Sequence, residues 1–137
     1  MIPFLLSLML VVAPDTYVVS NGLGGSVGYH ATKVIQLKSD NISVEIKGMW
    51  CISSCTMYLG SGNVCIHSST IFWFHGPSMW GIPLKPSDFK YWSDVIGSFY
   101  KPLLKLWYME TARYSQKAIP VAGSTLISVG YKECVKV

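Results

Sequence analysis

The feature that most constrains the fold is a change from strand periodicity to helix periodicity, which occurs twice within the first sixty residues. A short β-branched strand at 17–19 leads into a glycine-rich loop and then into an apolar-striped helix over about 26–38. A second strand, 42–47, alternates apolar and polar residues, which predicts a strand with one exposed face or an edge strand. The stretch 51–59 then turns into a second helix. Successive strand–helix units favour right-handed crossovers and therefore predict a mostly parallel sheet covered by helices.

The second half of the chain adds short strands at 64–66 and 71–74 and then a helical segment that begins near Pro86. Pro102 should kink or split this helical segment. Its apolar stripe predicts core packing or a subunit interface, and the stripe consists of Phe89, Trp92, Ile96, Phe99 and Leu103. The tail contains a short helix or turn near 124–126 and a final strand within 130–135. We therefore expect a single α/β domain over residues 1–137 with a C-terminal helical segment.

Composition narrows the functional classes. Half of the 137 residues are hydrophobic and 13% are charged, so much of the chain must be hidden by a core, a partner subunit or a membrane. The net charge of +4 comes from scattered lysines without a basic stripe, which argues against nucleic-acid binding. Residues 1–13 are apolar and too short to span a bilayer comfortably, and they fit either a signal-peptide core or membrane anchor, or a buried first helix.

Three stretches of the sequence together provide the parts of an acyl-transfer site. Ser53 lies where a strand should end and a helix begin, so the next amide, that of Ser54, would point outward with the helix dipole behind it. The Gly24–Gly25 pair would let a second backbone N–H approach the same point. His75 ends a strand that should neighbour the strand leading to Ser53, where it would be placed as a general base.

The same residues carry a resemblance to a known family. The run Asn-Gly-Leu-Gly-Gly-Ser-Val at 21–27 is similar to the Asn-Ser-Pro-Gly-Gly-Ser-Val loop of the Clp protease proteolytic subunit, which belongs to the crotonase-like superfamily. The run Cys-Ile-Ser-Ser-Cys-Thr at 51–56 resembles the Cys-Ala-Ser-Ala-Cys-Thr of predicted periplasmic or secreted Clp-like proteins. Phe-His followed by Pro at 74–77 resembles the strand that ends in the catalytic histidine.

The resemblance implies a β-β-α superhelix and a serine peptidase-like hydrolase without a cofactor or a metal. It implies Ser53 as nucleophile, His75 as base, and the backbone amides of Gly25 and Ser54 as the oxyanion hole. An extended peptide or protein substrate would lie along the strand edge beside a loop that includes Gly24, Ser26 and Val27. The resemblance further implies a homo-oligomer, and a periplasmic, secreted or membrane-associated location is favoured over a cytoplasmic one.

The sequence also departs from the family. Leu23 replaces the usual proline, and no counterpart of the third, orienting aspartate is evident: Asp88 and Asp94 come early, which leaves Glu110 as the best remaining carboxylate. A Ser–His pair without that carboxylate loses much of its rate. The alternative is therefore a catalytically inactive Clp-like fold that acts as an oligomeric or membrane-associated binding protein. Acyl-CoA chemistry on a crotonase fold is less favoured, because the sequence lacks a cluster for the CoA phosphates.

The four cysteines leave two interpretations open. Their even number suits disulfides in an oxidising compartment, and none of them has the close paired spacing of a zinc site. A Cys51–Cys65 pair would join opposite ends of a parallel sheet, and a Cys55–Cys65 pair is only slightly more plausible. The other interpretation is that the cysteines are buried free thiols.

Overall fold

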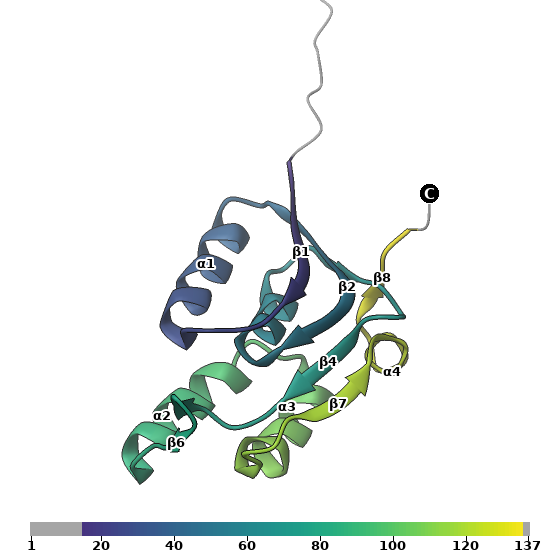
Figure 1. Cartoon of the computed structure of the whole chain (residues 1–137). Coiled ribbons are helices and arrows are strands. Elements are labelled where there is room, and N and C mark those ends of the chain that lie inside the picture. Colours follow the sequence, from purple (N-terminus) through teal and green to yellow (C-terminus); the bar gives the residue numbers. More distant parts are fainter. Residues whose placement is uncertain (1–14, 136–137) are drawn as a thin grey trace, which may run out of the picture.

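A computed structural model describes residues 15–135, which form a mixed α/β structure around a curled, mostly parallel sheet (Figure 1). The strands are β1 (Thr16–Gly22), β2 (Ser43–Ile52), β3 (Val64–Ile66), β4 (Ile71–Phe74), β5 (Ser78–Met79), β6 (Ile82–Pro83), β7 (Ile119–Ala122) and β8 (Lys132–Glu133). The α-helices are α1 (Val27–Ser39), α2 (Pro86–Gly97), α3 (Pro102–Glu110) and α4 (Gly123–Ser128), and the 3₁₀ helices are η1 (Ser53–Gly60) and η2 (Ala112–Tyr114). The signal, anchor or first-helix expectation for residues 1–13 lies outside the described residues.

Strand β2 is the centre of the sheet. Its first half pairs in parallel with β3, and its last three residues pair in parallel with β4, so β3 and β4 follow one another along the same edge. Strand β1 pairs in parallel along the opposite edge. Gly48 lies between the two halves of β2 with φ +91°, a conformation that suits glycine, and this allows the sheet to curl. Of the two expectations for 42–47, the strand with one exposed face is confirmed, since Val44 and Ile46 are buried while Glu45 is half-buried and Lys47 exposed, and the edge position is wrong, because β2 has neighbours on both sides.

The mostly parallel α/β sheet is confirmed, and two further strand pairings complete it. Strand β8 confirms the predicted final strand within 130–135, and it lies parallel to β3. Strand β7 lies antiparallel to β4 and was not predicted, because Pro120 interrupts its short apolar run. The expected second helix is present from Ser53 onward, but it is a 3₁₀ helix, and residues 51 and 52 still belong to β2.

The helices pack against the sheet through aromatic and aliphatic side chains. Figure 1 shows α1 beside β1, α3 close to β4 and β7, and α2 below α1 beside β6. Trp107 of α3 packs edge-on against Phe74 of β4, with ring centroids 5.4 Å apart. The predicted split at Pro102 is confirmed, since α2 ends at Gly97 and α3 begins at Pro102. Of the predicted stripe, Ile96 is buried, Phe89, Trp92 and Phe99 are half-buried, and Leu103 is 63% exposed.

Two disulfide bonds join the four cysteines, which confirms the disulfide interpretation but with pairings other than those considered. Cys51 joins Cys55 across the junction of β2 and η1, and Cys65 of β3 joins Cys134 just after β8. The pairings considered with Cys65 are therefore wrong, and so is the alternative of free thiols. The first bond is possible because the chain bends sharply between its two cysteines, and the second because β8 returns to lie beside β3.

Candidate active site

Ser53 occupies a strained corner between the end of β2 and the start of η1. Its φ is +59°, in the left-handed region, which is uncommon for a residue with a side chain. Strain of this kind is found at functional sites, and a serine on a sharp strand-to-helix turn is the geometry of a nucleophile elbow. The sequence prediction that Ser53 stands at a strand–helix corner is confirmed.

Several contacts fix this corner in place. The hydroxyl of Thr56 donates a 2.7 Å hydrogen bond to the backbone carbonyl of Ser53. Because that hydroxyl proton is used, the Tyr100 hydroxyl is the donor in its 2.5 Å bond to Thr56 Oγ1. Burial, and then the nearby Tyr108, raise the pKa of Tyr100, which keeps this hydroxyl protonated as a donor. The Cys51–Cys55 disulfide closes the chain around Ser53.

The glycine loop between β1 and α1 lies directly against this corner. Gly24 has φ +89° and Gly25 has φ +132°. A side chain on Gly24 would lie 2.8 Å from the carbonyl oxygen of Ile52 and 2.9 Å from Cβ of Ser53, so only glycine fits there. The hydroxyl of Ser54 donates a 3.0 Å hydrogen bond to the carbonyl of Gly25. No hydrogen bond within residues 15–135 uses the Gly25 N–H, which leaves it available to a bound group.

His75 follows directly after β4, which runs parallel to β2, as expected. Its Nδ1 lies 2.6 Å from the carbonyl oxygen of Gly76. A carbonyl can only accept, so Nδ1 must carry the proton and Nε2 of the neutral ring has the free lone pair of a base. Gly76 is buried so closely against the Arg113 carbonyl that a Cβ would clash there. The Tyr108 hydroxyl donates a 3.2 Å bond to the backbone carbonyl of His75.

A cavity of about 120 Å³ brings these groups together. Ser53, His75 and Gly25 all line it, and its remaining walls are mostly apolar or aromatic, with Val27, Thr56, Phe74, Pro77, Ile96 and Tyr100 among them. The hydrogen bonds of the described residues include none between the Ser53 hydroxyl and the His75 imidazole. In the absence of substrate such contacts are often long, so lining one small cavity is the relevant observation.

The expected candidates for a third, acidic member are placed elsewhere. Asp94 pairs with Lys90 at 2.7 Å and with Arg113 at 3.2 Å, and the hydrogen bond from Lys90 is the main cause that lowers its pKa. Asp88 faces Lys85 at 3.9 Å, and Glu110 is exposed at the end of α3. Within residues 15–135 no carboxylate is hydrogen-bonded to His75, whose Nδ1 partner is a backbone carbonyl.

Other predicted and unpredicted residues complete the site. Ser26 caps α1, because its hydroxyl accepts a 3.2 Å bond from the Tyr29 N–H, and Val27 lines the cavity. The sequence analysis missed Thr56 and Tyr100, and it missed His30, whose ring contacts the Gly24 carbonyl. The one available signal for His30 was its place one turn into the helix that follows the glycine loop.

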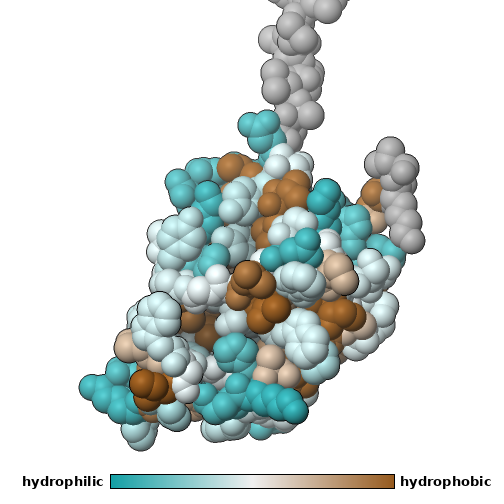
Figure 2. Space-filling model, viewed as in Figure 1, coloured by the Kyte–Doolittle hydropathy of each residue, from teal (hydrophilic) through white to brown (hydrophobic). Residues whose placement is uncertain are grey.

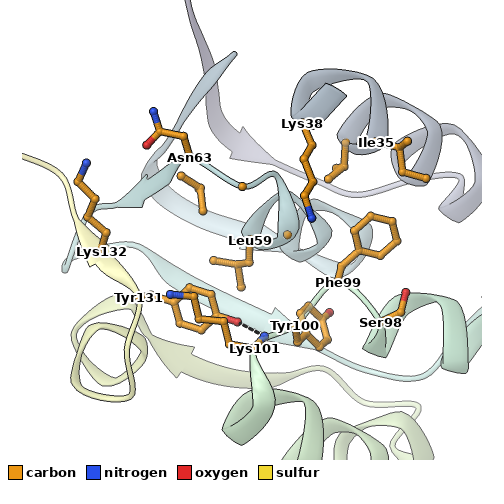
Figure 3. Close-up of a pocket in the computed structure, with 14 residues that line it drawn as sticks. Ile35, Lys38, Leu59, Asn63, Ser98, Phe99, Tyr100, Lys101, Tyr131 and Lys132 are labelled. Atoms are coloured by element: carbon orange, nitrogen blue, oxygen red, sulfur yellow. Dashed lines mark hydrogen bonds between the residues drawn. The ribbon is translucent and has the colours of Figure 1, made fainter. Parts of the chain in front are cut away.

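A larger cavity, of about 650 Å³, shares Tyr100 with the small cavity but is lined by neither Ser53 nor His75 (Figure 3). Figure 3 shows Lys38, Lys101 and Lys132 around it, with Leu59 and Tyr131 among its lining residues. Among the described residues that line it there is no histidine, cysteine or carboxylate, so it lacks a serine–histidine pair like that of the small cavity. Across residues 15–135, no three His, Cys, Asp or Glu side chains gather closely enough to hold a metal ion.

In comparisons with known proteins, no family model matches the chain and no curated protein is significantly similar to it in sequence. The resemblance to the Clp protease proteolytic subunit therefore rests on three short motifs, at 21–27, 51–56 and 74–77. What that resemblance implies about activity remains a proposal.

Proposed function

We propose that this chain is a serine peptidase-like hydrolase that uses Ser53 as nucleophile and His75 as general base. The observation that carries the proposal is the small cavity lined at once by Ser53, His75 and Gly25. Ser53 stands on a left-handed strand-to-helix turn, and His75 is held in the tautomer that leaves Nε2 free to take a proton.

The mechanism follows from these positions. His75 Nε2 takes the proton of the Ser53 hydroxyl as its oxygen attacks the scissile carbonyl carbon. The oxyanion that forms accepts hydrogen bonds from the backbone N–H groups of Gly25 and Ser54. His75 then gives its proton to the leaving amine, and the acyl-enzyme is hydrolysed by a water that the same imidazole activates.

The carbonyl of Gly76 would take part of the role that the orienting carboxylate has in a Ser–His–Asp triad. It fixes the ring and the tautomer of His75 through a 2.6 Å bond, which is the part of an orienting aspartate's role that controls proton transfer. A neutral carbonyl stabilises the imidazolium less than a carboxylate would. We therefore expect a working but slow enzyme.

The proposal extends to the fold, the substrate and the compartment. The curl of the sheet around β2 supports a Clp-like or crotonase-like superhelix. Among the described strands β1 pairs with β2 alone, so its other edge is open to an extended peptide beside the glycine loop. Two disulfides support a periplasmic or secreted location. None of the helices within residues 15–135 has the length and apolar character needed to cross a membrane.

Turnover of a fluorogenic peptide library tests the proposal. The wild-type protein should release fluorophore, and Ser53→Ala and His75→Gln should each reduce the rate to background. Ser124→Ala is the matched control, because Ser124 is exposed on α4 and outside the cavity, and it should keep the wild-type rate. A rate that survives Ser53→Ala would show that another residue is the nucleophile.

The second candidate is a catalytically silent binding or assembly protein: within residues 15–135 no carboxylate is hydrogen-bonded to His75, which favours it, and exposed apolar surface is compatible with it. Trp80 in the β5–β6 hairpin is 95% exposed, and Leu103 and Leu106 of α3 are 63% and 55% exposed. Figure 2 shows apolar surface at several places on one face of the molecule. This surface equally suits a homo-oligomer of the peptidase. Sedimentation of the wild type and of a Leu103→Lys, Leu106→Lys variant distinguishes a self-associating chain from a monomer.

A further inference from the structure

The oxyanion hole proposed above depends on the direction of one peptide group, the one between Gly24 and Gly25. A trans peptide is planar, and its C=O and N–H point in opposite directions. Whatever holds the Gly24 carbonyl therefore also directs the Gly25 N–H. Both residues are glycines at positive φ, so their own backbone preferences do little to fix this plane.

His30 holds that carbonyl. Its Nε2 lies 3.3 Å from the carbonyl oxygen of Gly24, and its Nδ1 lies 2.9 Å from the hydroxyl of Tyr58. The carbonyl can only accept, so Nε2 carries a proton, and in the neutral ring Nδ1 then accepts from the Tyr58 hydroxyl. Burial, and then the nearby Tyr17, raise the pKa of Tyr58, so its hydroxyl remains a donor.

We propose that His30 is a positioning residue that aims the Gly25 N–H at the oxyanion. This inference rests on the proposed function. His30 draws the Gly24 carbonyl to one side, so the N–H of the same peptide group is directed away from His30, and Gly25 itself lines the cavity with Ser53. The rigid base of the arrangement is Tyr58, which is 3% exposed and stacks on Tyr17 at 5.9 Å.

A second contact fixes the other side of Gly25. The hydroxyl of Ser54 donates to the Gly25 carbonyl at 3.0 Å, so the peptide groups before and after Gly25 are each tied to a different element. His30 ties the loop to α1, and Ser54 ties it to η1. A flexible glycine pair becomes a preorganised donor in this way, which is the condition for oxyanion stabilisation.

Kinetics of three variants test the inference. Replacing His30 by leucine (His30→Leu) removes the donor, and it should lower kcat by about ten- to a hundredfold with little change in KM, since one oxyanion donor is worth about 10²–10³ in kcat. His30→Gln should recover most of that loss, because the glutamine amide nitrogen can take the place of Nε2. His67→Leu is the matched control, since His67 pairs with Glu45 outside the site, and it should leave kcat unchanged.

A structural readout separates this inference from the proposed function. In a Ser53→Ala background, adding His30→Leu should shift the amide resonance of Gly25 and speed its hydrogen exchange, while the amides of β2 stay unchanged. If the wild type neither hydrolyses peptides nor reacts at Ser53, the proposed function fails, and the Gly25 amide still tests the positioning role. A Gly25 amide unchanged by His30→Leu, or an active His30→Leu enzyme with wild-type kcat, would overturn the inference.

Discussion

Ser53, the proposed nucleophile, and His75, the proposed base, are held in place in different ways. Ser53 is fixed by the disulfide around it, by the Thr56 hydroxyl on its carbonyl and by the glycine loop packed against it. His75 is fixed at its ring by one hydrogen bond to a backbone carbonyl next to it in the chain. Constraint is therefore concentrated on the proposed nucleophile and the proposed oxyanion hole.

This difference indicates which side of the site would contribute most to the rate of reaction. Preorganised donors and a rigid nucleophile supply electrostatic stabilisation of the transition state, usually the largest single contribution to catalysis. A carbonyl that orients the base secures the tautomer without a countercharge. Changes on the nucleophile side should accordingly cost more activity than changes around the base that leave its imidazole in place.

The largest effect is expected from Gly24→Ala. The new methyl would meet the Ile52 carbonyl at 2.8 Å and Ser53 Cβ at 2.9 Å, so the glycine loop must move away from the nucleophile. We expect activity to fall by about a hundred- to a thousandfold, as when an oxyanion donor is lost. Gly81→Ala is the control. Gly81 also has a positive φ (+76°), but its new methyl would meet no atom within 4 Å, so this variant measures only the cost of placing alanine in that backbone conformation. Equal activity in the two variants would contradict the importance of the loop.

The two disulfides should separate activity from stability. Cys65–Cys134 spans 69 residues and should stabilise the fold by about 4 kcal/mol, whereas Cys51–Cys55 spans 4 and should contribute about 2 kcal/mol by chain entropy. The double variant Cys51→Ala, Cys55→Ala should nevertheless lose more activity, because it relaxes the chain around Ser53. Urea unfolding and peptide turnover of both double variants measure this. If activity merely follows stability, the short disulfide has no role at the site.

Alkaline pH should weaken the fold through its buried tyrosines. Burial is the main cause that raises the pKa of Tyr100, Tyr108 and Tyr131 above the ordinary value of about 10. Their contribution to the free energy of unfolding is fully present below pH 10. It is lost as the pH rises toward the folded-state pKa, because the tyrosines of the unfolded chain release their protons first. Urea unfolding at pH 7, 9 and 10.5 should show a loss confined to the highest pH, and Tyr100→Phe should reduce it. A free energy of unfolding that stays constant up to pH 10.5 would contradict the burial of these tyrosines.

The smallest effect is expected from Tyr108→Phe, on the base side. The Tyr108 hydroxyl donates to the backbone of His75 at 3.2 Å and does not touch the ring, so its loss should cost about 1 kcal/mol of stability and at most a few-fold in kcat. Thermal unfolding and turnover check both values. A hundredfold loss of kcat here would show that the base side is as tightly constrained as the nucleophile side.

The sequence predicted the parts of the site that local patterns encode. Ser53 at a strand–helix corner and His75 at the end of a neighbouring parallel strand both follow from periodicity and chain order. The Cys51–Cys55 bond was missed because it depends on the left-handed turn at Ser53, which no sequence rule for serine predicts. The Cys65–Cys134 bond depends on the return of β8 after the helical segment, which is a long-range property of the fold.

The groups proposed to position the site were missed for a different reason. The partner of His75 is the carbonyl of Gly76, and every residue has a carbonyl, so its role has no sequence signature. His30 becomes recognisable only when α1 has packed on η1 and its ring has reached Tyr58 and the Gly24 carbonyl. No sequence pattern offered an acidic partner for His75, and the structure engages Asp94 with Arg113 and Lys90 instead.

Reaction with a fluorophosphonate probe, mapped by mass spectrometry of the digested protein, tests most directly whether Ser53 is an activated nucleophile. The folded wild type should carry one adduct, on Ser53, and the adduct should be absent from Ser53→Ala, strongly reduced in His75→Ala and absent after unfolding in urea. A folded wild type that does not react would contradict the assignment of Ser53 and leave the binding-protein alternative in its place, whereas an adduct on another residue would contradict the assignment and show that a different residue is the nucleophile.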